Sequence, residues 1–138
     1  MKKFFYFAFA ALLCCTMTAC GDDDGGVGNP SDIIGEWSIV KEVYVEDGET
    51  DIDDEYAYGE YVWGFNEDGT GYIKEDGYVY ENFTYRVSGN TLFMSEDGYE
   101  GSAVIKQLTA SSLVLYEEEY DEEYDCMIQA TIYFERYE

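Results

Sequence analysis

Turn-forming residues recur along this chain at short intervals, and that spacing limits the fold more than any other feature. The intervals are rich in Val, Ile, Tyr, Phe and Thr, and none keeps a helical period. Such runs favour β-strands, and Asp-Gly pairs favour tight hairpins. The turns are Asp47-Gly48, Asp68-Gly69, Asp76-Gly77, Ser88 to Asn90, Asp97-Gly98, Thr109 to Ser112 and Glu119 to Glu123.

Seven turns join eight strands, so the sequence predicts an all-β fold. We place the strands near residues 34–46, 57–66, 69–75, 77–87, 90–95, 100–108, 112–118 and 124–137. Short hairpins make neighbouring strands pair in antiparallel fashion, which gives an up-and-down meander. Period-two alternation gives the strands one apolar face, so closure into an eight-stranded barrel would bury that face and remove both edges.

The first and last predicted strands provide a specific test of closure. They would run antiparallel, so the start of one lies beside the end of the other. Alternation along these strands points the side chains of both Trp37 and Arg136 into the barrel at these ends. We therefore predict that the Arg136 cation lies over the Trp37 ring, a contact that contributes about 0.5 to 2 kcal/mol.

These same residues carry a family resemblance. Gly35-Glu36-Trp37 and Arg136 resemble the Gly-x-Trp motif and the closing arginine of the lipocalin superfamily. The resemblance covers about residues 33–138 and is closest to the short lipocalin-like domains of bacterial lipoproteins. It implies that Gly35, Trp37 and Arg136 close the bottom of the barrel and have a structural rather than a catalytic role.

The N-terminus has the pattern of a lipoprotein export signal. Lys2 and Lys3 precede an apolar run, and Met17-Thr18-Ala19-Cys20 resembles a bacterial lipobox. We expect removal of residues 1–19, lipidation of Cys20 and anchoring in the outer membrane, with residues 20–32 as an acidic tether before a barrel at 33–138. Asp22 to Asp24 resemble an export tag to the cell surface, and they equally fit a solvated linker.

Charge and composition exclude several functions. The 138 residues include 31 acidic, 7 basic and no His side chains, which gives a formal net charge of -24. Nucleic acid is therefore excluded as a partner, and so are catalytic triads and zinc sites that need imidazole. Cys126 is alone once the signal and the anchor are set aside, so no intramolecular disulfide is expected. We expect a monomeric, non-catalytic protein without a cofactor.

Most acidic residues fall in loops that share one end of the predicted barrel. Alternate connections of a meander emerge together, so this acidic mouth lies opposite Trp37. Such a rim disfavours fatty acids and polyanions and favours cations, and it equally fits a simple role in keeping hairpin tips soluble. A metal site is not expected, since the weak calcium candidates Asp51, Asp53, Asp54 and Glu55 lack EF-hand spacing.

Large side chains fill the predicted interior, so we expect a small or shallow cavity rather than a deep one. The candidate ligand contacts are Lys41, Tyr61, Trp63, Glu81, Tyr85 and Glu117. The alternation of side chains along the strands places the three charged residues of this group inside the barrel. A charge there costs free energy unless it has an oppositely charged partner or contacts water. Either they line a solvated mouth or β-bulges turn them outward.

Two functions fit these observations. In the first, the barrel binds a small apolar or cationic ligand at its acidic mouth. In the second, a filled barrel contacts proteins or glycans through its acidic rim and its exposed tyrosines. The tyrosines on outward parity are Tyr78, Tyr80, Tyr133 and Tyr137.

Overall fold

A computed structural model describes residues 27–137. The predicted signal, Cys20 and the first part of the tether lie outside the described residues. A short 3-10 helix, η1 (Pro30–Ile33), precedes nine strands. The strands are β1 (Gly35–Glu46), β2 (Glu49–Asp53), β3 (Tyr61–Phe65), β4 (Thr70–Glu75), β5 (Tyr78–Ser88), β6 (Thr91–Glu96), β7 (Tyr99–Leu108), β8 (Ser112–Asp121) and β9 (Cys126–Tyr137).

Eight of these strands close into a barrel. β1 pairs with β3 on one side and with β9 on the other, and β3 to β9 pair in chain order between them. Every pairing in this ring is antiparallel. The predicted all-β, eight-stranded up-and-down barrel is confirmed.

The sequence prediction missed β2, which occupies a segment expected to be a loop. Asp47 and Gly48 both have positive φ, 49° and 78°, the geometry of a tight two-residue hairpin. The chain therefore turns straight back along β1, and Glu49–Asp53 pairs with Glu42–Glu46. As a result, the next barrel strand, β3, is shorter than predicted and begins at Tyr61.

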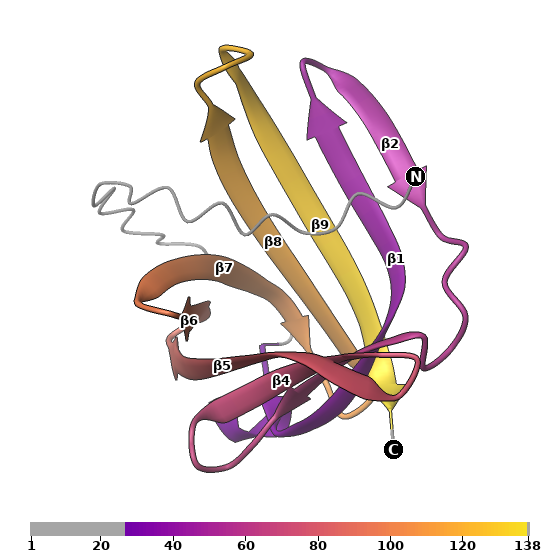
Figure 1. Ribbon diagram of the computed structural model, residues 1–138, viewed down its shortest axis with the longest axis vertical. Helices are drawn as coiled ribbons and strands as arrows, with labels where there is room; N and C mark the ends of the chain where they lie inside the picture. Colours follow the sequence, from indigo (N-terminus) through magenta and orange to yellow (C-terminus); the bar gives the residue numbers. More distant parts are fainter. Residues whose placement is uncertain (1–26, 138) are drawn as a thin grey trace.

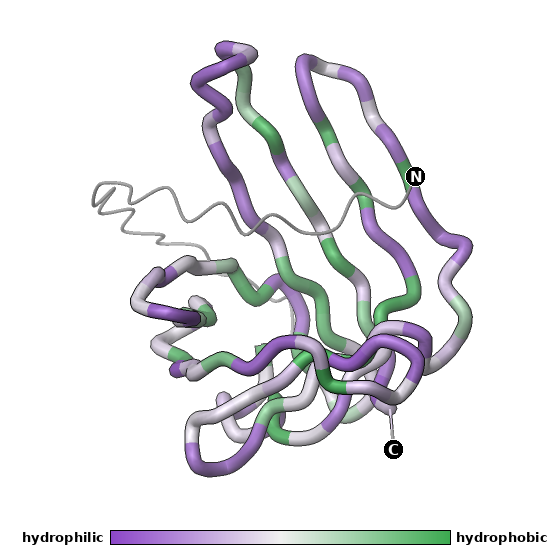
Figure 2. The backbone as a smooth tube through the Cα atoms, in the orientation of Figure 1, coloured by the Kyte–Doolittle hydropathy of each residue, from purple (hydrophilic) through white to green (hydrophobic). Residues whose placement is uncertain are grey.

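Strand pairing is incomplete at the upper end of the barrel in Figure 1. β1 pairs with β3 only as far as Ser38, and the pairing of β7 with β8 stops at Val104 and Tyr116. Above these positions β2, β1, β9 and β8 continue side by side, while β4 to β7 curve away (Figure 1). We call this open sheet the four-stranded extension, and Figure 2 shows hydrophilic residues at its hairpin tips.

The apolar core fills the closed lower part of the barrel. Trp37, Trp63, Phe65 and Phe134 are all fully buried. The centre of the Trp63 ring lies 5.3 Å from that of Phe134 and 6.4 Å from that of Phe83. Because protein interiors pack as densely as organic crystals, this aromatic cluster fills the lower part of the barrel.

Arg136 lies over Trp37, as the closure argument predicts. The guanidinium carbon is 3.8 Å from the centre of the indole ring, and the two residues are paired in register. Arg136 also donates hydrogen bonds to the carbonyl oxygens of Asp32, Ile34 and Ala110, at 2.8, 2.7 and 3.1 Å. A β-carbon at Gly35 would lie 2.5 Å from the guanidinium, so glycine is needed there.

The base of the barrel is also where the described chain begins. Val27 forms a bridge with Leu108, and the Gly28 N–H donates to the Leu108 carbonyl at 3.1 Å. The Trp37 indole N–H donates to the carbonyl of Ile33, the last residue of η1, at 2.7 Å. Among residues 27–137, no helix is long and apolar enough to cross a membrane.

Candidate functional site

A β-bulge in β1 decides which side chains face the inside of the four-stranded extension. Ile39 pairs with Phe134 but Lys41 pairs with Tyr133, so one extra residue reverses the parity of β1. Glu42 now lies opposite the buried Ile132 and faces inward. Lys41 faces outward, with its ammonium 4.1 Å from the centre of the Tyr133 ring. The inward alternative for Lys41 was therefore wrong.

Acidic side chains line the inner face of the extension on both sides of an apolar strip. The strip consists of Ile128, Ala130 and Ile132 on β9. Residues that lie directly opposite each other on paired strands point to the same face of the sheet. The strand register therefore places acidic residues of β1, β2 and β8 on the same face as this strip. These acids are Glu42, Glu46, Glu49, Asp51, Asp53, Glu117, Glu119 and Asp121. We call this inner face, with the upper rims of β4 to β6, the mouth.

Glu42 is the one carboxylate among residues 27–137 that is fully buried, with 3% of its surface exposed. The Tyr44 and Tyr56 hydroxyls donate hydrogen bonds to its Oε2 at 3.0 and 2.6 Å. Burial raises the pKa of Glu42, the two hydrogen bonds oppose that rise, and the charge of Asp53 adds to it. Burial and the Glu42 charge also raise the pKa of both tyrosines, so their hydroxyls remain donors.

Two further carboxyl groups of the mouth titrate near neutral pH. Burial, together with the charges of Glu119 and Glu42, raises the pKa of Glu117 to about 7. On the opposite wall, burial and the neighbouring Glu96 raise the pKa of Glu81 to about 7. Both groups therefore change charge in the physiological range, because like charges and burial disfavour their ionised forms.

Tyrosines cover the wall that faces the extension. The Tyr61 hydroxyl donates to Glu75 at 2.6 Å, and its ring meets the Tyr56 ring edge-on with centres 5.8 Å apart. A bulge in β5 makes Tyr80 an extra residue, since Ile73 pairs with Glu81 and Lys74 with Val79. Tyr80 is 51% exposed, and burial together with the charges of Glu81, Glu75 and Glu42 raises its pKa to about 12.

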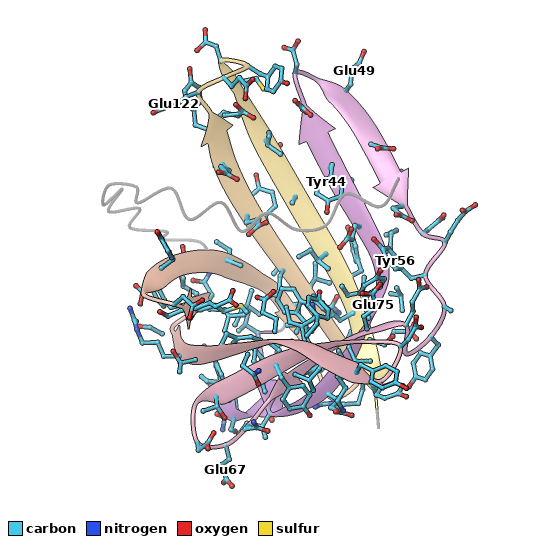
Figure 3. The ribbon with its side chains drawn as sticks, in the orientation of Figure 1. Tyr44, Glu49, Tyr56, Glu67, Glu75 and Glu122 are labelled. Atoms are coloured by element: carbon cyan, nitrogen blue, oxygen red, sulfur yellow. The ribbon has the colours of Figure 1, made fainter. Side chains whose placement is uncertain are left out.

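Figure 3 shows how these groups follow one another along the molecule. Tyr56 and Glu75 lie at the level where β1 leaves the closed barrel, and Tyr44 lies higher on β1. Glu49 and Glu122 stand at the tips of the two long hairpins. Acidic groups therefore extend from the top of the core to the open end of the mouth.

The remaining predicted ligand contacts lie in different parts of the barrel. Glu81 and Glu117 face the mouth from separate strands, whereas Tyr61 and Trp63 are 6% and 1% exposed and belong to the core cluster. Tyr85 lies toward the base, where its ring packs on Phe65 with centres 5.0 Å apart and its hydroxyl donates to the Asn66 carbonyl at 2.6 Å.

The other predicted surface groups do not form one site. Tyr78 is exposed, Tyr133 lies under Lys41, and the Tyr137 ring packs 5.3 Å from that of Tyr58. Within the described part of the chain, no three acidic or sulfur-containing side chains are placed to hold a metal ion. The calcium candidates are therefore not brought together; they are Asp51, Asp53, Asp54 and Glu55.

The Lys and Arg side chains of the described chain all contact partners outside the mouth. The five Lys and Arg side chains of residues 27–137 all lie on the outer face or at the base. The partners are Tyr133 for Lys41, Glu36 and Tyr72 for Lys74, Phe93 and Glu100 for Arg86, Tyr116 for Lys106, and Trp37 for Arg136. The acids of the mouth thus face no countercharge from these residues.

Sequence reasoning missed Glu42, Tyr44 and Tyr56. Strict alternation from Trp37 places Glu42 outside, and only the bulge brings it in. One signal was present, because the same alternation forced Lys41 into an apolar interior. An unpaired charge at a core position is a reason to place a bulge before it.

Residues 33–115 match a family model described as a lipocalin-like domain. No curated protein matches. Among solved structures, the chain is similar to "Bovine Odorant Binding Protein deswapped triple mutant", with 17% identity, a TM-score of 0.45, and coverage of 77% of this chain and 74% of that one.

Proposed function

The chain belongs to the lipocalin-like domain family, and from this premise we propose that it binds a small ligand with a cationic head and an apolar body at its mouth. One observation carries the proposal. Acidic groups line both walls of the mouth, while every Lys and Arg of residues 27–137 is engaged elsewhere. A ligand cation would supply the missing countercharge.

The ligand head would sit between Glu42 and Glu117, which lie on the two strands that flank β9. Carboxylates form their strongest hydrogen bonds with charged donors such as an ammonium group. Tyr44 and Tyr56 contribute electron-rich rings beside Glu42, and such rings attract cations. The head group therefore meets charge, hydrogen-bond acceptors and aromatic faces in one place.

The apolar body would lie along the strip of Ile128, Ala130 and Ile132. This strip runs between the two acidic rows and reaches down to the packed core. Burying apolar ligand surface there contributes about 25 cal/mol per Å². The filled lower barrel favours a ligand with a short body, such as a primary amine on a short alkyl chain or a single ring.

We also propose that Cys20 carries a lipid anchor in the outer membrane, with the mouth facing away from the bilayer. Met17-Thr18-Ala19-Cys20 supports the anchor, and the entry of the chain at the base supports the orientation. Exchange of Cys20 for Ser should move the protein from the membrane fraction to the soluble fraction. Retention of the variant in the membrane would contradict the anchor.

The binding proposal is tested with three probes that differ only in the head group: octylamine, octanol and octanoate. Calorimetric titration of a Cys20→Ser chain that starts at residue 20 should show binding of octylamine, weaker binding of octanol and none of octanoate. Glu117→Gln should weaken octylamine binding about fivefold, because it removes a charged hydrogen-bond acceptor. Glu67→Gln is the matched control, since Glu67 lies at the opposite end (Figure 3).

Two results would contradict the proposal. Equal affinity for octylamine and octanol would show that the acids do not recognise the head group. Equal weakening by Glu117→Gln and Glu67→Gln would show that only the net charge of the protein matters. The first result favours an apolar site, and the second favours diffuse attraction of cations.

A further inference from the structure

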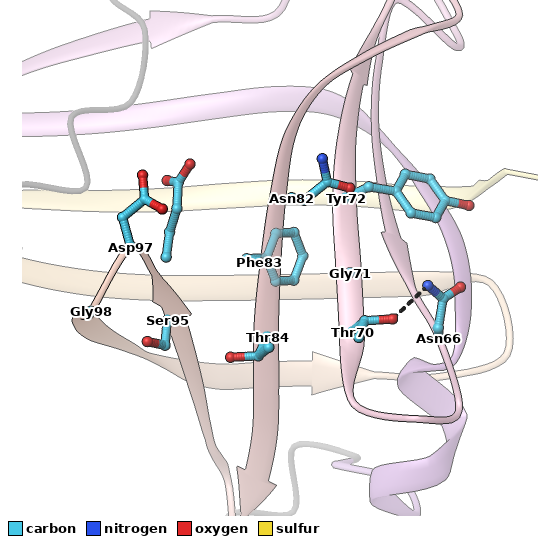
Figure 4. A pocket seen from close by; sticks show the side chains of 11 residues that line it. Asn66, Thr70, Gly71, Tyr72, Asn82, Phe83, Thr84, Ser95, Asp97 and Gly98 are labelled. Carbon is cyan, nitrogen blue, oxygen red and sulfur yellow. Dashed lines mark hydrogen bonds between the residues drawn. The ribbon is translucent and has the colours of Figure 1, made fainter.

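A groove crosses the outer face of the barrel over β4, β5 and β6 and reaches the rim of the mouth at Glu96 and Asp97. It has a volume of about 590 Å³ and runs from the β3–β4 turn to the β6–β7 turn (Figure 4). This volume falls within the range of small-molecule sites. Six side chains determine its character: Asn66, Thr70, Tyr72, Asn82, Thr84 and Ser95.

The hydroxyl groups of the groove form a row across three strands. Thr70 is paired with Thr84, and Thr84 is paired with Ser95, so their side chains stand beside one another on the outer face. Neighbouring strands lie about 4.8 Å apart, which makes the row about 10 Å long. Tyr72 and Asn82 form a second pair one step along the same strands.

Three polar side chains of the groove are available to a ligand. The side chains of Asn82, Thr84 and Ser95 make no hydrogen bond to any residue between 27 and 137. Thr70 is held in place instead, because its hydroxyl accepts from Asn66 at 3.0 Å and donates to Asp68 at 2.6 Å. The groove thus combines one fixed hydroxyl with three side chains that can rotate to suit a partner.

Tyr72 provides a rigid aromatic wall. Its hydroxyl donates to Glu36 at 2.6 Å, and its ring lies against the backbone of β3. A β-carbon at Gly64 would come within 2.2 Å of that ring, so glycine at this position makes room for it. The Lys74 ammonium lies 4.9 Å from the centre of the same ring, and the Tyr72 side chain lines the groove beside its hydroxyl and amide groups. An apolar ring beside such polar groups suits a ligand that has both C–H groups and many hydroxyls.

We infer that this outer groove binds a neutral saccharide of two to four sugar units. The hydroxyl and amide groups of the groove match sugar hydroxyls, and the Tyr72 ring beside them provides apolar surface for sugar C–H groups. Glu96 and Asp97 line one end of the groove, and Asp68 accepts a hydrogen bond from Thr70 near the other, so these carboxylates repel acidic sugars. Lys74 and Arg86, on the outer face, are each paired with a glutamate, Glu36 and Glu100 respectively.

The test uses amide chemical-shift mapping of the full-length protein in sugar-free detergent micelles. The probes are cellotetraose, maltotetraose and mannotetraose, with a tetragalacturonate as the acidic counterpart. At least one neutral probe should shift the amides of Thr70, Asn82 and Thr84, while tetragalacturonate leaves them unchanged. Absence of shifts with all three neutral probes at about 10 mM would overturn the inference, because any affinity would be too weak for a built site.

Variants on β5 identify the contacts. Asn82→Ala and Thr84→Val should each weaken binding of the responsive probe about fivefold, which corresponds to loss of one hydrogen bond. Ser88→Ala is the matched control, since Ser88 lies on the same face of β5 beyond the groove. Equal affinity in all three variants would overturn the inference. Octylamine binding at the mouth should be unchanged in each, so this groove and the proposed function can fail independently.

Discussion

Exchange of Arg136 for Met tests how the base of the barrel is held together. Methionine keeps an unbranched apolar stem but cannot donate hydrogen bonds. The change removes three bonds to carbonyl oxygens and the cation over Trp37. Each bond counts for about 1 kcal/mol because the site is half-exposed, and the cation-π contact for a similar amount. We expect the free energy of unfolding to fall by about 4 kcal/mol.

Urea unfolding followed by tryptophan fluorescence measures this loss, and Arg86→Met is its control. The Arg86 guanidinium lies 3.8 Å from the Phe93 ring centre, the same distance as in the Arg136 contact, but it makes no carbonyl bond. The control should lose less than about 1 kcal/mol, as is usual for exposed charged contacts. Equal losses in the two variants would refute the claim that Arg136 ties the base together.

Four further predictions concern stability, its pH dependence and ligand affinity. Trp37→Ala should lower the free energy of unfolding by about 3 to 5 kcal/mol in the same assay, because it empties a fully buried aromatic site. Gly64→Ala should cost about 1 to 3 kcal/mol, because the Tyr72 ring must move; an unchanged urea midpoint would contradict this. Glu81 and Glu117 keep their protons to about pH 7 when folded but lose them near the usual 4.5 when unfolded. The folded state therefore binds more protons in this range, so stability should fall from about pH 5 to about pH 8, with a smaller fall in Glu117→Gln. Octylamine affinity should rise over the same interval by about tenfold as these groups gain charge, which calorimetry at both pH values checks.

The barrel could be predicted because its determinants are local. Asp-Gly pairs such as Asp76-Gly77 and Asp97-Gly98 adopt the positive φ angles of tight hairpins, so short-range sequence fixed which strands are neighbours. Closure then followed from the need to bury one apolar face, and it placed Arg136 beside Trp37. These inferences depend only on the order of the strands along the chain, so they hold even when a predicted strand boundary is wrong by a few residues.

The mouth could not be predicted to the same extent because its determinants are not local. The β1 bulge leaves no distinctive residue type, yet it moves Glu42 inward and Lys41 outward. β2 contains Asp51 and Asp53, which are poor strand formers, and pairing with β1 after the hairpin overrides that preference. Burial of Glu42 by Tyr56 depends on a loop contact between residues 14 positions apart in sequence.

The central claim is that the inner face of the four-stranded extension receives a cationic ligand. Amide chemical-shift mapping of octylamine at about pH 8, above the pKa of about 7 of Glu81 and Glu117, tests it most directly. The largest shifts should fall on Glu42, Tyr44, Glu117 and Ala130, which line the two walls and the strip between them. Shifts confined to the outer face or to the hairpin tips would contradict the claim.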